Sequence, residues 1–254
     1  MLDGITGGLV ASLVAAFGTA LGAFALLLRK QWQPRQRTHM LAVAAGVMLG
    51  ATFFSLILPA LEGLGSDRVA ALTVAALIIA GAASVGGLNR IVPHEHLVKG
   101  REGPERTGID GSTLFVLAIT LHNLPEGLSV GVAATADFNA GVPVLVGITA
   151  QNIPEGFAVA AALLSGGTSR GRAALIGAAT GLAEVVGGVL GALVVGIGSA
   201  VVPYAYAFAA GAMLYVISGE VIPETHAEGK EASATFALVF GFCAMMLLDL
   251  SLGT

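Results

Sequence analysis

The amino-acid sequence predicts an all-α integral membrane protein with eight transmembrane helices, arranged as an inverted repeat (3+2+3) with both termini external. The composition excludes an ordinary soluble chain, because 56% of the 254 residues are hydrophobic, only 11% are charged and the mean hydropathy is +0.87. Apolar segments of about 20 residues, the length that crosses a hydrocarbon core of roughly 30 Å, can be drawn eight times. Two of these segments carry similar six-residue motifs, HNLPEG at 122–127 and QNIPEG at 151–156.

The eight helices use nearly the whole chain, so we expect a single transmembrane domain over 1–254. Asp3 is the only charged residue before the first apolar segment. The segment therefore lacks the basic leader of a signal peptide, and we expect it to remain as a helix. Cys243 is the only cysteine, which excludes an intrachain disulfide and a thiolate metal cluster. We place the helices near 5–28, 40–61, 69–88, 113–135, 142–164, 173–196, 203–222 and 234–252.

The basic residues predict the orientation, because Lys and Arg concentrate on the cytoplasmic side of membrane proteins. With eight spans, all of the 12 basic residues except Arg68 fall on one side, which includes a loop at 89–112 between the third and fourth helices. We therefore expect this loop to be cytoplasmic and both termini to be external. The basic residues on that side are Arg29, Lys30, Arg35, Arg37, Arg90, Lys99, Arg101, Arg106, Arg170, Arg172 and Lys230.

Acidic residues on the predicted external side suggest a route of entry for cations. Glu62 and Asp249 lie at helix ends beside apolar residues, and a negative vestibule concentrates cations. We expect an entry role for these two, while Asp3, Asp67 and Asp137 are equally well explained as solvated loop groups.

The repeated phrase places a carboxylate and a proline in each of two apolar helices. An ionisable side chain at membrane depth is costly and usually marks an ion path, which makes Glu126 and Glu155 candidates. Pro125 and Pro154 cannot donate the usual helical hydrogen bond, so each also frees a backbone carbonyl. The two prolines are equidistant from the turn at Asn139, so we expect the motifs to face each other near mid-membrane on antiparallel helices.

The spacing within the phrase predicts a cation site. His122 and Glu126 are four residues apart and share one helix face, and Gln151 and Glu155 repeat that spacing. Imidazole and carboxylate are ligands of Zn²⁺ and of related divalent ions. A second ion could bind beside the first, because Asn123 and Asn152 directly follow His122 and Gln151 in the chain. Both ions would share Glu126 and Glu155, and Glu184 would complete the second site.

Other candidates lie outside the two motifs. Met48 offers a thioether but is equally well explained as core filling. The seventh helix ends in GEVIPETH, which suggests an exit-side metal site, although solvated helix-end groups are the rival explanation; its members would be Glu220, Glu224 and His226. His94 and His96 in the sequence HEH would either sense metal or belong to an ordinary loop.

A fainter repeat joins the second and seventh helices. GVML at 46–49 precedes Pro59, and GAML at 211–214 precedes Pro223 at nearly the same distance. Because these two helices run in opposite directions, the pattern indicates an inverted repeat of the kind that places a transport site at the repeat interface. Chance similarity of apolar helices is the alternative.

HNLPEG followed by QNIPEG on the fourth and fifth of eight helices resembles the ZIP (Zrt/Irt-like) metal transporters, in particular their bacterial GufA-like branch. The resemblance spans the whole chain. It implies uptake of Zn²⁺, and also Cd²⁺, Fe²⁺ or Mn²⁺, through a binuclear site by an elevator-like mechanism, in a homodimer of the bacterial inner membrane. The ligand set that it implies is Met48, His122, Asn123, Glu126, Gln151, Asn152, Glu155 and Glu184.

One departure from the family pattern concerns Gln151 and Asn152, where many relatives have histidine or an acid. Neutral amides reduce the negative charge of the site, which leaves the preferred metal open. We expect no prosthetic group, no enzyme activity and no nucleic-acid partner; the partners would be the metal ions and the lipid bilayer. Two alternatives are an intramembrane metal-dependent hydrolase and a metal sensor without transport. The HExxH motif that such a hydrolase would be expected to have is absent from this sequence.

Overall fold

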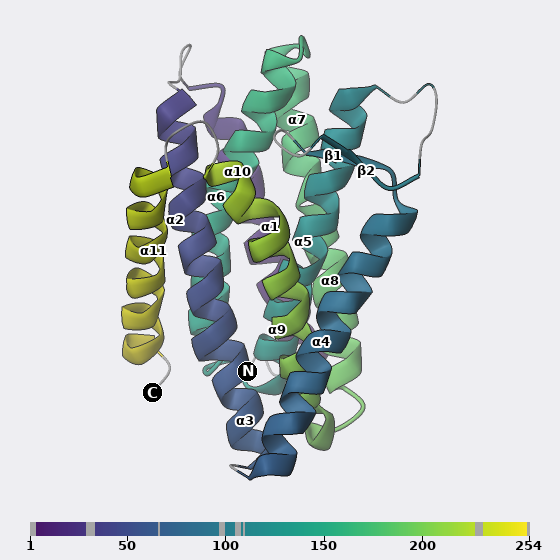
Figure 1. Cartoon of the computed structure of the whole chain (residues 1–254), viewed down its shortest axis with the longest axis vertical. Helices are drawn as coiled ribbons and strands as arrows, with labels where there is room; N and C mark the ends of the chain where they lie inside the picture. Colours follow the sequence, from purple (N-terminus) through teal and green to yellow (C-terminus); the bar gives the residue numbers. More distant parts are fainter. Residues whose placement is uncertain are drawn as a thin grey trace.

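A computed structural model gives the structure of this chain and confirms the all-helical, eight-span architecture. It describes residues 4–28, 34–65, 67–96, 100–104, 108, 110–226 and 231–252, with only the backbone for 34–37. The spans run over Ile5–Ala25, Thr38–Leu64, Arg68–Ile91, Gly111–Ala136, Val142–Ser165, Arg170–Val195, Ser199–Thr225 and Glu231–Leu252. They lie side by side in an elongated bundle (Figure 1).

Three of the spans are divided into shorter helical segments. The elements are α1 (Ile5–Ala25), α2 (Pro34–Gly50), η1 (Ala51–Ile57), α3 (Leu58–Leu64), α4 (Arg68–Ile91), β1 (His94–His96), β2 (Gly100–Glu102), α5 (Gly111–Ala136), α6 (Val142–Ser165), α7 (Arg170–Thr180), α8 (Leu182–Val195), η2 (Ser199–Val201), α9 (Val202–Val216), η3 (Ile217–Val221), α10 (Ile222–Thr225) and α11 (Glu231–Leu252).

The second and seventh spans each contain a π-helical segment just before a proline. In the second span η1 precedes Pro59, and in the seventh η3 precedes Pro223. A proline inside a helix cannot donate to the carbonyl four residues earlier, so the local hydrogen-bond pattern must change. These segments, which the sequence did not predict, lie at matching places in the two halves of the chain.

The packing of the helices follows the predicted inverted repeat. Helix α1 packs along α6 and α5 along α8, while α2 packs along α11 and α4 along α9. The inverted repeat relates the first three spans to the last three in order, and the fourth span to the fifth. This relation converts the α1–α6 pair into the α8–α5 pair, and the α2–α11 pair into the α9–α4 pair. The 3+2+3 arrangement is therefore present in the packing as well as in the order of the helices.

Glycines hold the paired helices in close contact at equivalent positions. Gly46 of the GVML phrase lies against the carbonyl oxygen of Leu238, and Gly211 of the GAML phrase lies against that of Ile78. A side chain at either glycine would overlap the opposing carbonyl, so only glycine permits the approach. The similarity between the GVML and GAML motifs of the second and seventh spans is therefore explained by the close helix contact that the glycine of each motif permits.

The first and sixth spans meet the two motif helices in the same way. Gly22 of α1 lies against the carbonyl oxygen of Ile153, in the QNIPEG phrase, and Gly187 of α8 lies against that of Leu124, in the HNLPEG phrase. Each motif helix is thereby held against its partner at the residue before its proline. The motif helices and these partners form one group of helices (α1, α5, α6, α7 and α8), and the remaining spans form a second group.

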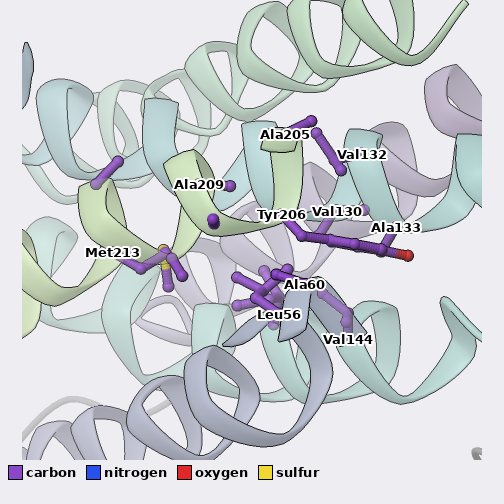
Figure 2. Packing of buried hydrophobic residues seen from close by; sticks show 14 of the residues in the cluster. Leu56, Ala60, Val130, Val132, Ala133, Val144, Ala205, Tyr206, Ala209 and Met213 are labelled. Atoms are coloured by element: carbon purple, nitrogen blue, oxygen red, sulfur yellow. The ribbon is translucent and has the colours of Figure 1, made fainter. Parts of the chain in front are cut away.

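An apolar cluster joins the two groups along the bundle and includes residues at the end away from β1 and β2. Figure 2 shows Leu56 and Tyr206 of the second group packed with Val130 and Val144 of the first. All four side chains are at least nine-tenths buried. Val130 and Val144 lie beyond the motif carboxylates along α5 and α6, so this part of the cluster packs on the side of the carboxylates away from the hairpin.

The loop predicted at 89–112 contains a small hairpin rather than only irregular backbone. Strands β1 and β2 are antiparallel, with His94 opposite Glu102 and His96 opposite Gly100. Because side chains alternate along a strand, His94 and His96 share one face and are buried, while Glu95 points to the other. The HEH segment is therefore a strand.

The marked ends of the chain lie at the end of the bundle away from the hairpin (Figure 1). Four basic residues with described side chains lie at the hairpin end, at the end of α4, in β2 and at the start of α7: Arg90, Arg101, Arg170 and Arg172. Arg68 begins α4 at the opposite end. Five further residues of the orientation argument, together with Asp3, lie outside the described part of the chain: Arg29, Lys30, Lys99, Arg106 and Lys230.

Candidate metal centre

The two motifs bring buried polar groups together in the middle of the bundle. Helix α5 contributes His122 and Glu126, and α6 contributes Gln151 and Glu155; all four are at least 93% buried, with exposed fractions of 3%, 0%, 2% and 7%. Pro125 and Pro154 lie inside their helices without ending them. The four-residue spacing therefore places the ionisable groups of both helices on their inner faces, as the sequence predicted.

A second group of polar side chains surrounds the carboxylate of Glu184 on α8. Its Oε1 atom accepts hydrogen bonds from the Thr19 hydroxyl and, at 3.5 Å, from Asn123 Nδ2. Its Oε2 atom accepts one from Asn152 Nδ2 at 2.6 Å. Asn152 in turn accepts a hydrogen bond from Gln151, so this group is continuous with the motif side chains.

Glu126 lies between these groups. Its carboxylate is fully buried beside those of Glu155 and Glu184, and among the described residues neither of its oxygens accepts a hydrogen bond of regular geometry. A buried carboxylate without a donor is strongly unfavourable, and neighbouring carboxylates add repulsion. A divalent cation held among the three would remove both costs.

A narrow cavity, which we call the metal-ligand cavity, is bordered by His122 and Glu155. Its polar wall is formed by Met48, His122, Gln151, Glu155 and Glu224, and its volume is about 20 Å³. This is room for about one water-sized particle. Gln151 Oε1 is buried without a hydrogen-bond partner, which leaves it available as a ligand. The cavity therefore gathers soft, imidazole and oxygen donors around a space of the size of one ion.

The candidate exit residues of the seventh span continue the site toward the hairpin. Glu220 on η3 pairs with His122 and accepts a hydrogen bond from Asn89 Nδ2 at 2.6 Å. Glu224 on α10 lines the metal-ligand cavity. His226 lies apart from them: its Nδ1 atom is 3.1 Å from the carbonyl oxygen of Ile222, and its Nε2 atom is 3.1 Å from the Thr235 hydroxyl.

The hairpin adds two imidazoles to this end of the site. The ring of His96 stacks on that of His122, with centroids 5.8 Å apart, and its nitrogens lie 3.9 Å from Glu220 and 3.9 Å from Glu224. His94 Nε2 lies 3.6 Å from Glu102. Burial, together with the nearby His122, lowers the pKa of His96 to about 4. Its imidazole is therefore neutral at physiological pH, the form that binds metals.

Two triads of possible ligands result from this arrangement. In each triad, the possible ligand atoms lie within 4.8 Å of one another. One triad is His96, His122 and Glu220, and the other is His94, His96 and Glu102. Because His96 belongs to both triads, possible ligands extend without a break from His122 on α5 to Glu102 on β2.

The candidate entry residues lie away from the motif carboxylates, on α3 and α11. Glu62, near the end of α3, is exposed. Asp249, near the end of α11, is half-buried and accepts a hydrogen bond from the hydroxyl of Ser55 in η1. The structure therefore does not bring these two residues to the metal centre.

Sequence reasoning missed two contributors to the centre. Thr19 and Asn89 bind the carboxylates of Glu184 and Glu220 from helices that carry no motif, and no local signal identifies them. The burial of His94 and His96 had a signal, since HEH alternates with the period of a strand and places both histidines on one face.

Comparisons with known proteins show the family of this chain. Residues 94–249 match the family model described as ZIP Zinc transporter. The chain is 45% identical to zinc transporter GufA of Myxococcus xanthus over 97% of this chain and 99% of that protein. It is 45% identical to zinc transporter ZIPB of Bordetella bronchiseptica over 92% of this chain and 78% of that protein, and 32% identical to zinc transporter ZupT of Salmonella paratyphi A over 96% and 95%.

Proposed function

Because this chain belongs to the ZIP family of zinc transporters, we propose that it carries Zn²⁺ across the bacterial inner membrane into the cytoplasm. Members of this family are transporters rather than enzymes, and the chain is a multi-pass membrane protein. The observation that carries the proposal is Glu126, a fully buried carboxylate that lies beside those of Glu155 and Glu184 and accepts no hydrogen bond of regular geometry from the described residues. Such an arrangement is stable only with a cation or with bound protons.

The centre would hold two ions. Met48, His122, Gln151 and Glu155 would bind the ion of the metal-ligand cavity, and Asn123, Asn152 and Glu184 the second, with Glu126 and Glu155 shared. Support comes from the lining of the cavity and from the hydrogen bonds that join the two amides to Glu184. With two neutral amides in the set, the site would also accept Cd²⁺, Fe²⁺ or Mn²⁺ at different affinity.

The ion would leave through the hairpin end of the bundle. Glu220, Glu224 and His96 lie next to the metal-ligand cavity on that side, and the described basic residues at that end are those expected to face the cytoplasm. Entry would begin on the opposite face, where Glu62 and Asp249 attract cations. The apolar cluster of Leu56 and Tyr206 would close the entry side in the present conformation.

The two helix groups would move against each other during transport. Nearly all proposed ligands belong to the group of α1, α5, α6, α7 and α8, whereas Met48 belongs to the second group. A sliding motion of the first group would carry the ions with their carboxylates, and the second group would remain fixed and form the contacts of a homodimer.

Substitution of Glu126 tests the proposal. In proteoliposomes that contain the purified protein, Glu126→Gln should abolish most zinc uptake, because the amide cannot balance the charge of two ions. Glu231→Gln is the matched control, since Glu231 is exposed at the start of α11. Undiminished zinc flux through the Glu126→Gln protein would overturn the proposed function.

A further inference from the structure

A second, larger cavity lies at the hairpin end of the bundle. We call it the inner vestibule; its volume is about 380 Å³ and its wall includes Glu95, His96, Ser112, Phe115 and Ser165. These residues belong to β1, the start of α5 and the end of α6. The inner vestibule therefore lies between the hairpin and the first helix group, on the side where the ion is proposed to leave.

Phe115 lines both the inner vestibule and the metal-ligand cavity. One turn earlier on α5, Ser112 lines only the inner vestibule, and one turn later Ile119 lines only the metal-ligand cavity. The side chain of Phe115 is 7% exposed and packs in an apolar cluster with Phe157 and Leu163. Its ring therefore forms part of the wall that separates the two cavities.

The polar part of the same region is His96. Its imidazole lines the inner vestibule and lies 3.9 Å from Glu224, which lines the metal-ligand cavity. A ligand for the ion is therefore available on the vestibule side of the wall. The aromatic ring offers no ligand, and passage of a cation against apolar groups is unfavourable.

We propose that Phe115 is the inner gate of this protein: its ring closes the metal-ligand cavity from the inner vestibule and must move aside before the ion is released. The inference rests on the proposed transport function and adds to it the residue that limits release. Loss of the ring would join the two cavities, and a larger ring would hold them apart.

Access of a thiol reagent to the metal-ligand cavity tests the gate without measuring transport. Ala158 lines the metal-ligand cavity but not the inner vestibule, and Cys243 is the only native cysteine. The parent protein is therefore Ala158→Cys with Cys243→Ser, in inside-out membrane vesicles treated with a membrane-impermeant cationic methanethiosulfonate. Because the modification rate follows the fraction of open molecules, Phe115→Ala should raise it by about tenfold or more.

Phe157→Ala is the matched control, because it removes the same side chain from the same apolar cluster but borders neither cavity. The modification rate in this variant should stay at the parent value. An unchanged rate in Phe115→Ala would overturn the proposal. An equal increase in Phe157→Ala would also overturn it, because general loosening of the cluster would then explain the access.

Zinc flux supplies a second readout that separates the gate from the proposed function. Phe115→Trp should lower the maximal rate of zinc uptake several-fold while the KM for zinc stays the same, because the ligands are untouched. If the protein without any substitution moves no zinc, the proposed function fails while the thiol measurement still decides on the gate. If that protein transports zinc and Phe115→Trp matches it, only the gate is rejected.

Discussion

Thr19 and Glu184 occupy equivalent positions in the two repeats, and the Thr19 hydroxyl donates a hydrogen bond to the Glu184 carboxylate. Each residue lies three positions before the glycine that packs against a motif helix, Gly22 in α1 and Gly187 in α8. The repeat is therefore symmetric in its backbone and asymmetric in its chemistry. One half supplies the carboxylate, and the other supplies the hydroxyl that holds it.

Thr19→Val should destabilise the metal-free protein by about 1 to 3 kcal/mol, because a buried carboxylate loses a donor. Zinc should reduce this difference, since a bound cation replaces part of the lost interaction. Thermal unfolding of purified protein with and without zinc measures both effects. Thr149→Val is the control, because its hydroxyl bonds only to the carbonyl of Leu145 in its own helix; a zinc-insensitive loss in Thr19→Val would contradict the expectation.

Gly211→Ala should destabilise the protein by about 1 to 3 kcal/mol, because the new methyl group would overlap the carbonyl oxygen of Ile78 and force α9 away from α4. Gly87→Ala provides the comparison, since this helical glycine has open space where a Cβ would lie. The unfolding temperature of Gly211→Ala should therefore be lower than that of Gly87→Ala. Equal temperatures would show that the close approach of the two helices is not required.

His96→Asn should lower the maximal rate of zinc uptake several-fold, because the imidazole that connects His122 and Glu224 to the inner vestibule is lost. Arg101→Gln tests the hairpin itself, as its side chain is exposed and pairs with Glu95. Flux assays in proteoliposomes compare the two. A similar decrease in both variants would indicate a need for the hairpin fold rather than for the imidazole.

Asp110 should make the first turn of α5 sensitive to acid. Its two oxygens accept hydrogen bonds from the backbone N–H and the hydroxyl of Thr113, both at 2.9 Å, and these bonds lower the pKa of Asp110 below its usual value. Because the folded pKa is the lower one, this stabilisation is complete above the unfolded pKa and is lost as the pH falls through the folded pKa. It is also lost in Asp110→Ala.

Amide hydrogen exchange measures this effect. The N–H of Thr113 should exchange faster in Asp110→Ala than in the unmodified protein at neutral pH, and the difference should shrink in acid. The N–H of Ala70, which donates to Asp67 at the start of α4, is the internal reference and should not change. Equal exchange of Thr113 in the two proteins at neutral pH would contradict the prediction.

The sequence by itself determined the eight spans, the inverted repeat and the carboxylates of the centre. Span length and hydropathy are local properties, so the ends of the helices could be placed within a few residues, for example 142–164 against Val142–Ser165. The HNLPEG and QNIPEG phrases were equally informative, because a carboxylate four residues after a polar side chain must share its helix face.

Only the tertiary structure decided which groups surround the motif carboxylates and which apolar side chains pack on either side of them. Thr19 reaches Glu184 across 165 positions of the chain, and His96 reaches His122 because a hairpin folds back onto the bundle. The apolar cluster around Tyr206 and the ring of Phe115 likewise depend on how separate helices pack. These relationships join residues far apart in the chain, whereas hydropathy and motif spacing describe only neighbours, so no local pattern could predict them.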